Sequence, residues 1–290
     1  MNYRILGVAV ALVSLFSPES KAIQVFIMAG QSNTEGGALI DNATPVNQAD
    51  YGPDFAPVTY SYHYENNPNP DVVGAFGALR SDSGYHGWEI SLGRELDTAL
   101  GGGIAIIKFT QGGSNLHTDW NETLTNLYDD FITHVNTQVA TLQLSHASVE
   151  LRGMFWHQGE SDSDELPALA YESNLLSFFD QVRVDLSTPD LNFIAGKLNE
   201  TGSWAMGTDW EDDVNAAIQS AADSNSYIST IATTDDISLL PDGLHYASDG
   251  HIELGKRMAD SYIQNFTIPE TSVIGLLLAA AIGIGLQRRR

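Results

Sequence analysis

The chain has 290 residues, 43% of them apolar, which is enough for one large α/β domain with a sizeable core and excludes a disordered or fibrous protein. Thirteen basic residues stand against 37 acidic ones, and the formal charge of −24 would repel phosphate backbones and anionic membrane surfaces. We therefore expect no nucleic-acid partner.

The amino-terminal 22 residues have the three parts of a secretory signal peptide. Arg4 supplies a basic start, residues 5–16 are almost wholly apolar, and Ser20-Lys21-Ala22 provides small residues before a cleavage site. The apolar run is shorter than the ~20 residues that a membrane-spanning helix needs. We therefore predict that residues 1–22 are removed on export, and that the mature chain, which has no cysteine, relies on its core rather than on disulfides.

Buried-strand patterns alternate with helical patterns between residues 23 and 267. The predicted strands begin at Ile23 and cover 23–29, 104–109, 151–156, 191–195 and 227–232. The predicted helices cover 88–100, 121–144, 164–186, 209–223 and 247–266, the last capped by Ser248. This alternation predicts an α/β fold, a three-layer α/β/α sandwich around a central parallel sheet of about five strands. No repeat or linker interrupts the pattern, so residues 23–267 are expected to form one domain.

Residues 41–87 are dense in Asn, Pro, Tyr, Asp and Gly and show neither helical nor alternating periodicity. We predict a long loop, of the kind that often walls a binding site. The segment and the residue after it carry several aromatic side chains: Tyr60, Tyr62, Tyr64, Phe76, Tyr85 and Trp88. These rings would either stack on sugar rings or pin the loop to the body of the domain, and the sequence favours neither reading.

Small and polar residues follow three of the predicted strands. They are Gly30-Gln31-Ser32-Asn33, Gly112-Gly113 and His157-Gln158-Gly159-Glu160. In open α/β sheets, ligands bind beyond the carboxyl ends of the strands. Paired glycines let backbone amides come close to a ligand, and a serine becomes a nucleophile when a base and oxyanion donors lie beside it. Taken singly, each of these groups is more simply a turn or cap residue.

The base is expected from the last loop, where Asp242 lies three residues before His245. That spacing can place the carboxylate against one imidazole nitrogen and leave the other free, as the acid member of a catalytic triad does. Alone, the pair would be a surface ion pair. The other histidines have no comparable partner in sequence, so His245 is the candidate base, and together with Ser32 the strand-end groups predict a hydrolase site.

Four motifs carry a family resemblance over about residues 23–266. They are GQSN at 30–33, KFTQGGS at 108–114, WHQGESD at 156–162 and DGLHYASDGH at 242–251. With these motifs the chain resembles the SGNH hydrolases, specifically the sialate O-acetylesterase-like branch that includes carbohydrate esterase family 6. It departs from the pattern at Thr34, where methionine often follows GQSN, and at Ser114, where threonine is common.

The resemblance implies the flavodoxin-like SGNH hydrolase fold and a role for each matching residue. Ser32 is the implied nucleophile, His245 the general base and then acid, and Asp242 its orienting partner. The implied oxyanion donors are the backbone amide of Ser32, the amide of Gly112 or Gly113, with Gly113 preferred, and the side-chain amide of Gln158, which stands where the wider superfamily has asparagine.

Five further residues are expected either to contact substrate or to support the groups that do: Gln31, Asn33, Glu160, His157 and Trp88. No cofactor is expected. A metal site would need ligands beyond His157 and Glu160 at suitable spacing, and the sequence offers none.

The implied activity is removal of O-acetyl groups from a carbohydrate through an acyl-serine intermediate. Acetylated xylan, pectin, sialic acid and a self-made exopolysaccharide all fit as substrates. One alternative is an esterase for lipid or other acyl groups, which would want a deep apolar acyl pocket. The other is a carbohydrate-binding protein that keeps the fold without catalysis. The sequence leaves the oligomeric state open.

The carboxyl-terminal residues 268–290 form a second tripartite segment. Residues 268–272 read IPETS, residues 273–286 are apolar, and the chain ends in three arginines. This tail resembles the PEP-CTERM sorting signal of Gram-negative bacteria, with Thr271 in place of the second proline. The resemblance implies transient association with the inner membrane, processing by a sorting peptidase, and a periplasmic, cell-surface or extracellular location; a plain short anchor is the alternative.

Overall fold

The computed structural model describes residues 22–64, 75–80, 84–202 and 210–267. The sorting tail and all but the last residue of the signal peptide lie outside these ranges, so both assignments stay predictions. No helix within the described ranges is both long enough and apolar enough to span a membrane.

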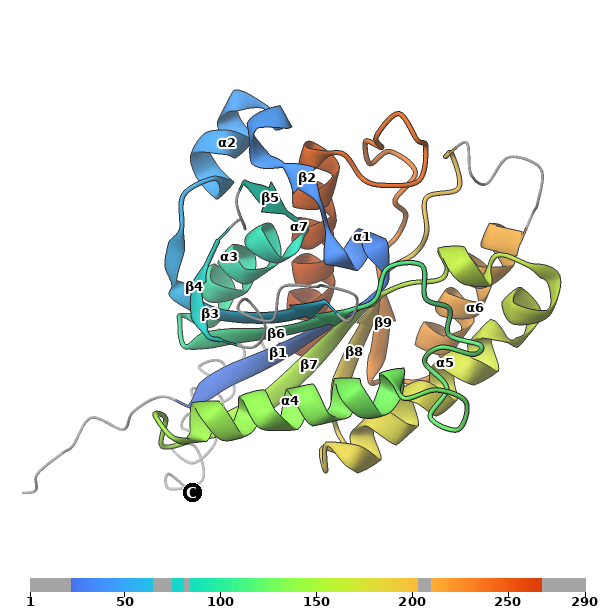
Figure 1. The fold of residues 1–290 in the computed structure, drawn as a ribbon, viewed down its shortest axis with the longest axis horizontal. Helices are drawn as coiled ribbons and strands as arrows, with labels where there is room; N and C mark the ends of the chain where they lie inside the picture. Colours follow the sequence, from blue (N-terminus) through green and yellow to red (C-terminus); the bar gives the residue numbers. More distant parts are fainter. Residues whose placement is uncertain (1–21, 65–74, 81–83, 203–209, 268–290) are drawn as a thin grey trace, which may run out of the picture.

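The centre of the fold is a sheet of seven strands (Figure 1). Its strands along the chain are β1 (Ile23–Gly30), β3 (Phe55–Tyr64), β4 (Gly77–Leu79), β6 (Ile104–Thr110), β7 (Val149–His157), β8 (Asn192–Ala195) and β9 (Ile228–Thr230). In space they follow the order β4-β3-β6-β1-β7-β8-β9. Neighbouring strands are parallel except for β3 and β4, which pair antiparallel.

The five predicted strands are confirmed as β1, β6, β7, β8 and β9. Numbered along the chain, these five lie in the order 2-1-3-4-5, which is the flavodoxin-like order. Because β1 lies between β6 and β7, the chain leaves it toward one side of the sheet and later returns on the other. Such a reversal opens a crevice at the carboxyl end of the strand, and the crevice of this sheet therefore falls at Gly30.

The prediction of a long loop over residues 41–87 is wrong. The segment contains α2 (Pro45–Tyr51) and β3, and it ends at β5 (Tyr85–His86), which pairs antiparallel with β2 (Ala38–Leu39). A short 3-10 helix, η1 (Ile40–Asn42), precedes α2. In β3, Val58 and three tyrosines alternate with Thr59, Ser61 and His63, and this period of two marks a strand with one more apolar face.

Of the six aromatic side chains for which two roles are open, three have rings that are buried in the body of the domain, those of Tyr60, Tyr62 and Trp88. Tyr60 and Tyr62 are buried and stack on each other, with ring centroids 5.5 Å apart. Trp88 has no exposed surface and packs edge-on against Phe155. Of the two roles offered for Trp88, contact with substrate or support of the groups that make it, burial of the ring leaves only the second. Tyr85, by contrast, is 50% exposed.

Helices cover both faces of the sheet (Figure 1). One face carries α3 (Glu89–Leu100) and α7 (Ser248–Phe266), and the other carries α4 (Leu127–Gln143), α5 (Glu165–Asp185) and α6 (Trp210–Ser224). Side chains of β1 alternate between them: Val25 and Ile27 join the core under α4, α5 and α6, while Phe26 and Met28 join the core under α3 and α7. Each such buried side chain contributes roughly 1.5–3 kcal/mol relative to exposure. The predicted three-layer sandwich is confirmed.

Two of the predicted helix ends are moved by side-chain hydrogen bonds. The helix expected from residue 121 begins at Leu127, because the Asn121 side chain accepts a hydrogen bond from the Thr123 amide and holds a turn there. Ser248 is not the cap of α7: it is the first helical residue, and its hydroxyl lies 2.7 Å from His86 Nε2.

Candidate active site

Ser32 is the first residue of α1 (Ser32–Glu35), which follows β1 after a single residue. The turn depends on Gly30, because a Cβ at this position would lie 2.1 Å from the carbonyl oxygen of His157, at the end of the neighbouring strand. Thr34 fixes the turn from the other side by donating from Oγ1 to the same carbonyl at 2.7 Å. The hydroxyl at position 34, a departure from the family pattern, thus has a structural use.

The structure brings Ser32, His245 and Asp242 into one chain of contacts. His245 Nε2 lies 3.0 Å from Ser32 Oγ, and His245 Nδ1 lies 2.8 Å from Asp242 Oδ2. The other carboxylate oxygen, Oδ1, accepts hydrogen bonds from the backbone amides of Leu244 at 2.9 Å and His245 at 3.0 Å. The loop that carries the imidazole is therefore wrapped around the carboxylate that orients it.

The charge of Asp242 and the orientation of His245 suit proton transfer from Ser32. Partial burial raises the pKa of the Asp242 carboxyl, but hydrogen bonds from the His245 ring and from the Leu244 and His245 amides outweigh it and hold that pKa below its ordinary value. An ionised Asp242 accepts the Nδ1 proton of His245, so the lone pair on Nε2 faces the Ser32 hydroxyl. With His245 37% exposed and Asp242 47% exposed, substrate and water can reach the pair.

Asn33 joins the loop of His245 to the helix of Ser32. Its side chain is 2% exposed. Nδ2 donates to the Leu244 carbonyl at 3.1 Å and to Glu160 Oε1 at 2.7 Å, and Oδ1 accepts from the Tyr246 amide at 3.1 Å. Asn33 is therefore hydrogen-bonded to the backbone of the residues on either side of His245. This makes it a positioning residue rather than a substrate contact.

Gln158 does not present the expected oxyanion donor. Its side chain has no exposed surface, and Nε2 lies within hydrogen-bond distance of Asp162 Oδ2 at 2.7 Å and of the Ser114 carbonyl at 3.0 Å. Asp162 in turn accepts from the backbone amides of Leu116 at 2.7 Å and His117 at 3.0 Å. In this structure Gln158 ties the end of β7 to the loop after β6, because its amide protons are directed at protein acceptors.

The remaining predicted side chains in this region are supports. In one orientation, the side-chain oxygen of Gln31 accepts a hydrogen bond from Gln158 Nε2 at 3.0 Å. With the side-chain amide turned over, its nitrogen would donate to Glu160 Oε2 at 3.1 Å and to the Ser114 carbonyl at 3.2 Å. The Gln31 side chain is therefore hydrogen-bonded inside the protein in either orientation. Glu160, in η3 (Glu160–Asp162), is half-buried as the acceptor of Asn33. His157 is fully buried, and its Nδ1 lies 3.3 Å from the Gly196 carbonyl. Burial lowers its pKa, so the ring is neutral.

The two glycines after β6 differ in their surroundings. A Cβ on Gly112 would lie 3.8 Å from Ser32 Cβ and 3.1 Å from Glu35 Oε2, and the Gly112 amide donates to the Glu35 carboxylate. Gly113 is exposed, with a φ of 70° and open space where a Cβ would stand. The Gly112 amide is thus engaged by Glu35. This contact favours Gly113 as the free donor, and the choice stays a prediction.

Glu35 is a residue of the site that sequence reasoning missed. It is half-buried, and burial raises the pKa of its carboxyl, while the charge of Lys108, the Gly112 amide and His245 act in the opposite direction. The signal for it is the spacing: Glu35 lies three residues after Ser32, so one helical turn brings the two side chains to the same side.

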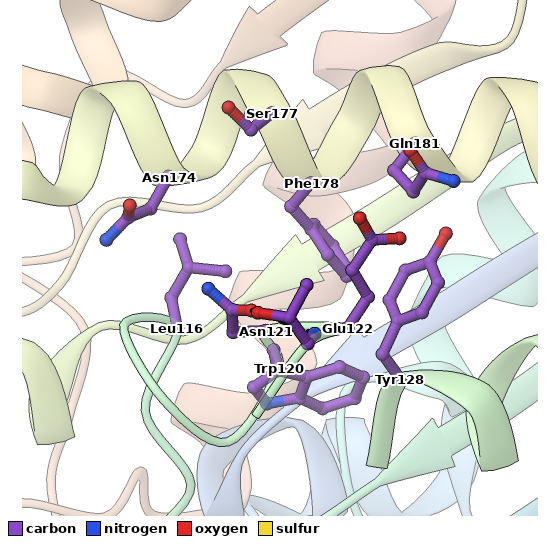
Figure 2. Close-up of a pocket in the computed structure, with 10 residues that line it drawn as sticks. Leu116, Trp120, Asn121, Glu122, Tyr128, Asn174, Ser177, Phe178 and Gln181 are labelled. Atoms are coloured by element: carbon purple, nitrogen blue, oxygen red, sulfur yellow. Dashed lines mark hydrogen bonds between the residues drawn. The ribbon is translucent and has the colours of Figure 1, made fainter. Parts of the chain in front are cut away.

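A separate cavity of about 290 Å³ lies between the loop before α4 and helix α5 (Figure 2). The side chains drawn around it include Trp120, Tyr128, Asn174, Phe178 and Gln181. None of its lining residues belongs to the Ser32, His245 and Asp242 chain, so the cavity is distinct from the reactive groups. Within the described ranges, no three His, Asp or Glu side chains are grouped as a metal site would need.

The chain is similar to known carbohydrate esterases. A family model for carbohydrate esterase, sialic acid-specific acetylesterase matches residues 22–264. A probable carbohydrate esterase of Arabidopsis thaliana is 22% identical over 261 residues, which cover 84% of this chain and 91% of the relative.

Solved structures share the fold. A protein from Arabidopsis thaliana superposes with a TM-score of 0.68 at 19% identity, over 85% of this chain and 100% of that one. A carbohydrate acetylesterase from Xanthomonas citri gives a TM-score of 0.60 at 18% identity, over 83% of this chain and 56% of that chain. At these identities the likenesses show that the fold is shared.

Proposed function

Because the chain belongs to the carbohydrate esterase, sialic acid-specific acetylesterase family and is thus a carboxylic ester hydrolase, we propose that it removes O-acetyl groups from a carbohydrate through an acyl-serine intermediate. The observation that carries this proposal is the contact chain in which His245 bridges Ser32 at 3.0 Å and Asp242 at 2.8 Å. A protein that only binds carbohydrate has no need for that alignment.

The chemistry proceeds in two displacements. Ser32 Oγ attacks the acetyl carbonyl while His245 Nε2 takes its proton, and the oxyanion is held by the Ser32 amide and a glycine amide. His245 then gives the proton to the sugar oxygen, which leaves as the alcohol and yields acetyl-Ser32. A water molecule, deprotonated by His245, attacks this ester. Acetate departs, and the proton returns to Ser32. Asp242 stabilises the imidazolium in both halves.

The test is acetate release by the wild type and by Ser32→Ala on acetylated xylan, acetylated pectin and an O-acetylated sialic acid. The wild type releases acetate from at least one of them, and the variant loses about 10,000-fold or more in kcat/KM. Circular dichroism checks that the variant is folded. In addition, mass spectrometry of the wild type quenched during turnover of p-nitrophenyl acetate should find the acetyl group on Ser32. Turnover by the variant at the wild-type rate would refute the nucleophile.

We also propose that the enzyme is exported across an inner membrane, because the sequence patterns at its two ends are those of a signal peptide and a sorting tail. Cleavage after Ala22 would leave Ile23, the first residue of β1, at the new amino terminus. Expression in a Gram-negative host tests this proposal: the processed protein should be found outside the cytoplasm with Ile23 first, and a full-length cytoplasmic product would contradict it.

A further inference from the structure

We propose that Glu35 makes this site select acetylated sugars that are neutral or cationic over acetylated sugars that carry a carboxylate. The proposal rests on the proposed function and narrows its substrate class. It starts from Glu35, a carboxylate that lies beside the nucleophile and outside the triad contacts.

The distances around Gly112 show where the Glu35 carboxylate lies relative to Ser32. The point where a Cβ on Gly112 would stand lies 3.1 Å from Glu35 Oε2 and 3.8 Å from Ser32 Cβ. The Gly112 amide donates to the Glu35 carboxylate and holds it there. Since Glu35 and Ser32 also lie at the two ends of the single turn of α1, the carboxylate is fixed on the side of the nucleophile where the loop after β6 contributes amides to an oxyanion.

The charge of Glu35 is not cancelled by a neighbour. Of the two basic side chains whose charge acts on it, Lys108 and His245, the stronger is Lys108, which is fully buried and whose Nζ donates to the backbone carbonyl of Glu35 at 2.8 Å. Lys108 is already ion-paired with Glu89 at 2.9 Å, and Glu89 is 3% exposed. Glu35, Lys108 and Glu89 together therefore keep one negative charge, and Glu35 is the member that solvent can reach.

The surroundings add negative charge rather than positive. Glu160 accepts a hydrogen bond from the side chain of Asn33, the residue after Ser32, and Asp242 contacts the His245 ring on the side away from Ser32. Proteins that bind a sugar carboxylate tightly usually do so with an arginine fork or a lysine. Among the described residues, the lysine that contacts α1 is instead Lys108, which is buried and already paired with Glu89. A uronate or a sialate would thus bring its carboxylate toward Glu35 without gaining an ion pair.

The expected size of the effect follows from Coulomb's law. The two contacts of Gly112 put Glu35 Oε2 within about 7 Å of Ser32 Cβ, and a substrate carboxylate at a similar distance in a partly hydrated site would be disfavoured by about 3- to 10-fold. A neutral sugar is not affected, and an amino sugar with a free ammonium group gains by a similar factor.

The experiment compares two probes that differ by one charge: the di-O-acetylated methyl glycoside of galacturonic acid and its uncharged carboxamide. Acetate release gives kcat/KM for each probe, and the readout is the carboxamide-to-acid ratio, in which any general loss of activity cancels. The variants are Glu35→Gln, which keeps the shape and the acceptor for the Gly112 amide, and Glu150→Gln as a control. Glu150 is a half-exposed carboxylate near the amino end of β7, at the opposite edge of the sheet.

We expect a ratio of about 3 to 10 for the wild type and for Glu150→Gln, and a ratio near 1 for Glu35→Gln, with the change mainly in KM. Adding 0.5 M salt should lower the wild-type ratio. A wild type that hydrolyses both probes equally, or a ratio unchanged in Glu35→Gln, overturns the proposal while leaving the esterase activity in place. A wild type that releases acetate from neither probe nor from the glycan panel overturns the proposed function itself.

Discussion

Replacing Asn33 with alanine tests how far the position of the His245 imidazole depends on a single buried side chain. The variant loses the two hydrogen bonds that grip the residues on either side of His245, at 3.1 Å to the Leu244 carbonyl and at 3.1 Å from the Tyr246 amide. It also loses the 2.7 Å bond to Glu160 Oε1. Tyr246 is 1% exposed, so its amide would be left buried without a partner.

The magnitudes follow from the kinds of bond lost. Two neutral hydrogen bonds contribute about 0.5–1.5 kcal/mol each and one to a carboxylate about 1.5–3 kcal/mol, so Asn33→Ala should lower the free energy of unfolding by about 2.5–6 kcal/mol. A shift of about 1 Å in the position of His245 costs roughly 100-fold in rate. We expect kcat to fall by about 10- to 100-fold. KM should change little, because the Asn33 side chain is buried away from substrate.

Urea unfolding and steady-state kinetics with p-nitrophenyl acetate measure both effects. The control is Asn265→Ala, at an exposed position of α7. Asn265, at the far end of α7, also donates two side-chain hydrogen bonds, to Ser229 Oγ at 2.9 Å and to the Ser261 carbonyl at 2.8 Å. This control should lose stability without losing kcat. If Asn33→Ala keeps wild-type kcat while its stability drops, the idea that Asn33 positions His245 is refuted.

Two further predictions use the triad and the buried imidazoles. Asp242→Asn should lower kcat by about 1,000- to 10,000-fold with little change in KM, because the amide no longer stabilises the imidazolium; steady-state kinetics that show less than a tenfold loss would contradict its role. His157 and His251 are fully buried, and burial lowers the pKa of both below 6.5. Below that pH the unfolded chain binds more protons than the native one, so the free energy of unfolding should fall by up to about 1.4 kcal/mol per pH unit for each residue as pH drops from 6.5 to 5. His251→Gln should reduce the change in the free energy of unfolding per pH unit, measured by urea titrations at several pH values. An unchanged slope would show that His251 does not contribute to this pH dependence.

The positions of the site residues in the fold could be predicted from the sequence because the carboxyl ends of parallel strands meet at one edge of a sheet. Ser32 follows β1 and Gly112 follows β6, and strand pairing places Gly30 beside Thr110. The Asp242 and His245 pair was also accessible, because the contact is local along the chain. These inferences need only periodicity and short spacings.

What the sequence could not reveal depends on three-dimensional contacts. Whether the Gln158 amide faces solvent or Asp162 is decided by the loop after β6, which turns its Leu116 and His117 amides toward the same carboxylate. The burial of Trp88 is decided by its packing on Phe155. Strand β3 was missed for a different reason: its alternation is carried by tyrosines inside a segment rich in proline and asparagine, a composition typical of loops.

The contact between Ser32 and His245 joins residues 213 positions apart. It links the strand that starts the domain to the loop that precedes its last helix, so no amino-terminal fragment contains a working site. A chain emerging from the ribosome carries a serine without its base until the loop of His245 has been made and has packed beside Ser32. Recovery of esterase activity during refolding is therefore a reporter of the final assembly step, whereas circular dichroism would register the helices before that step.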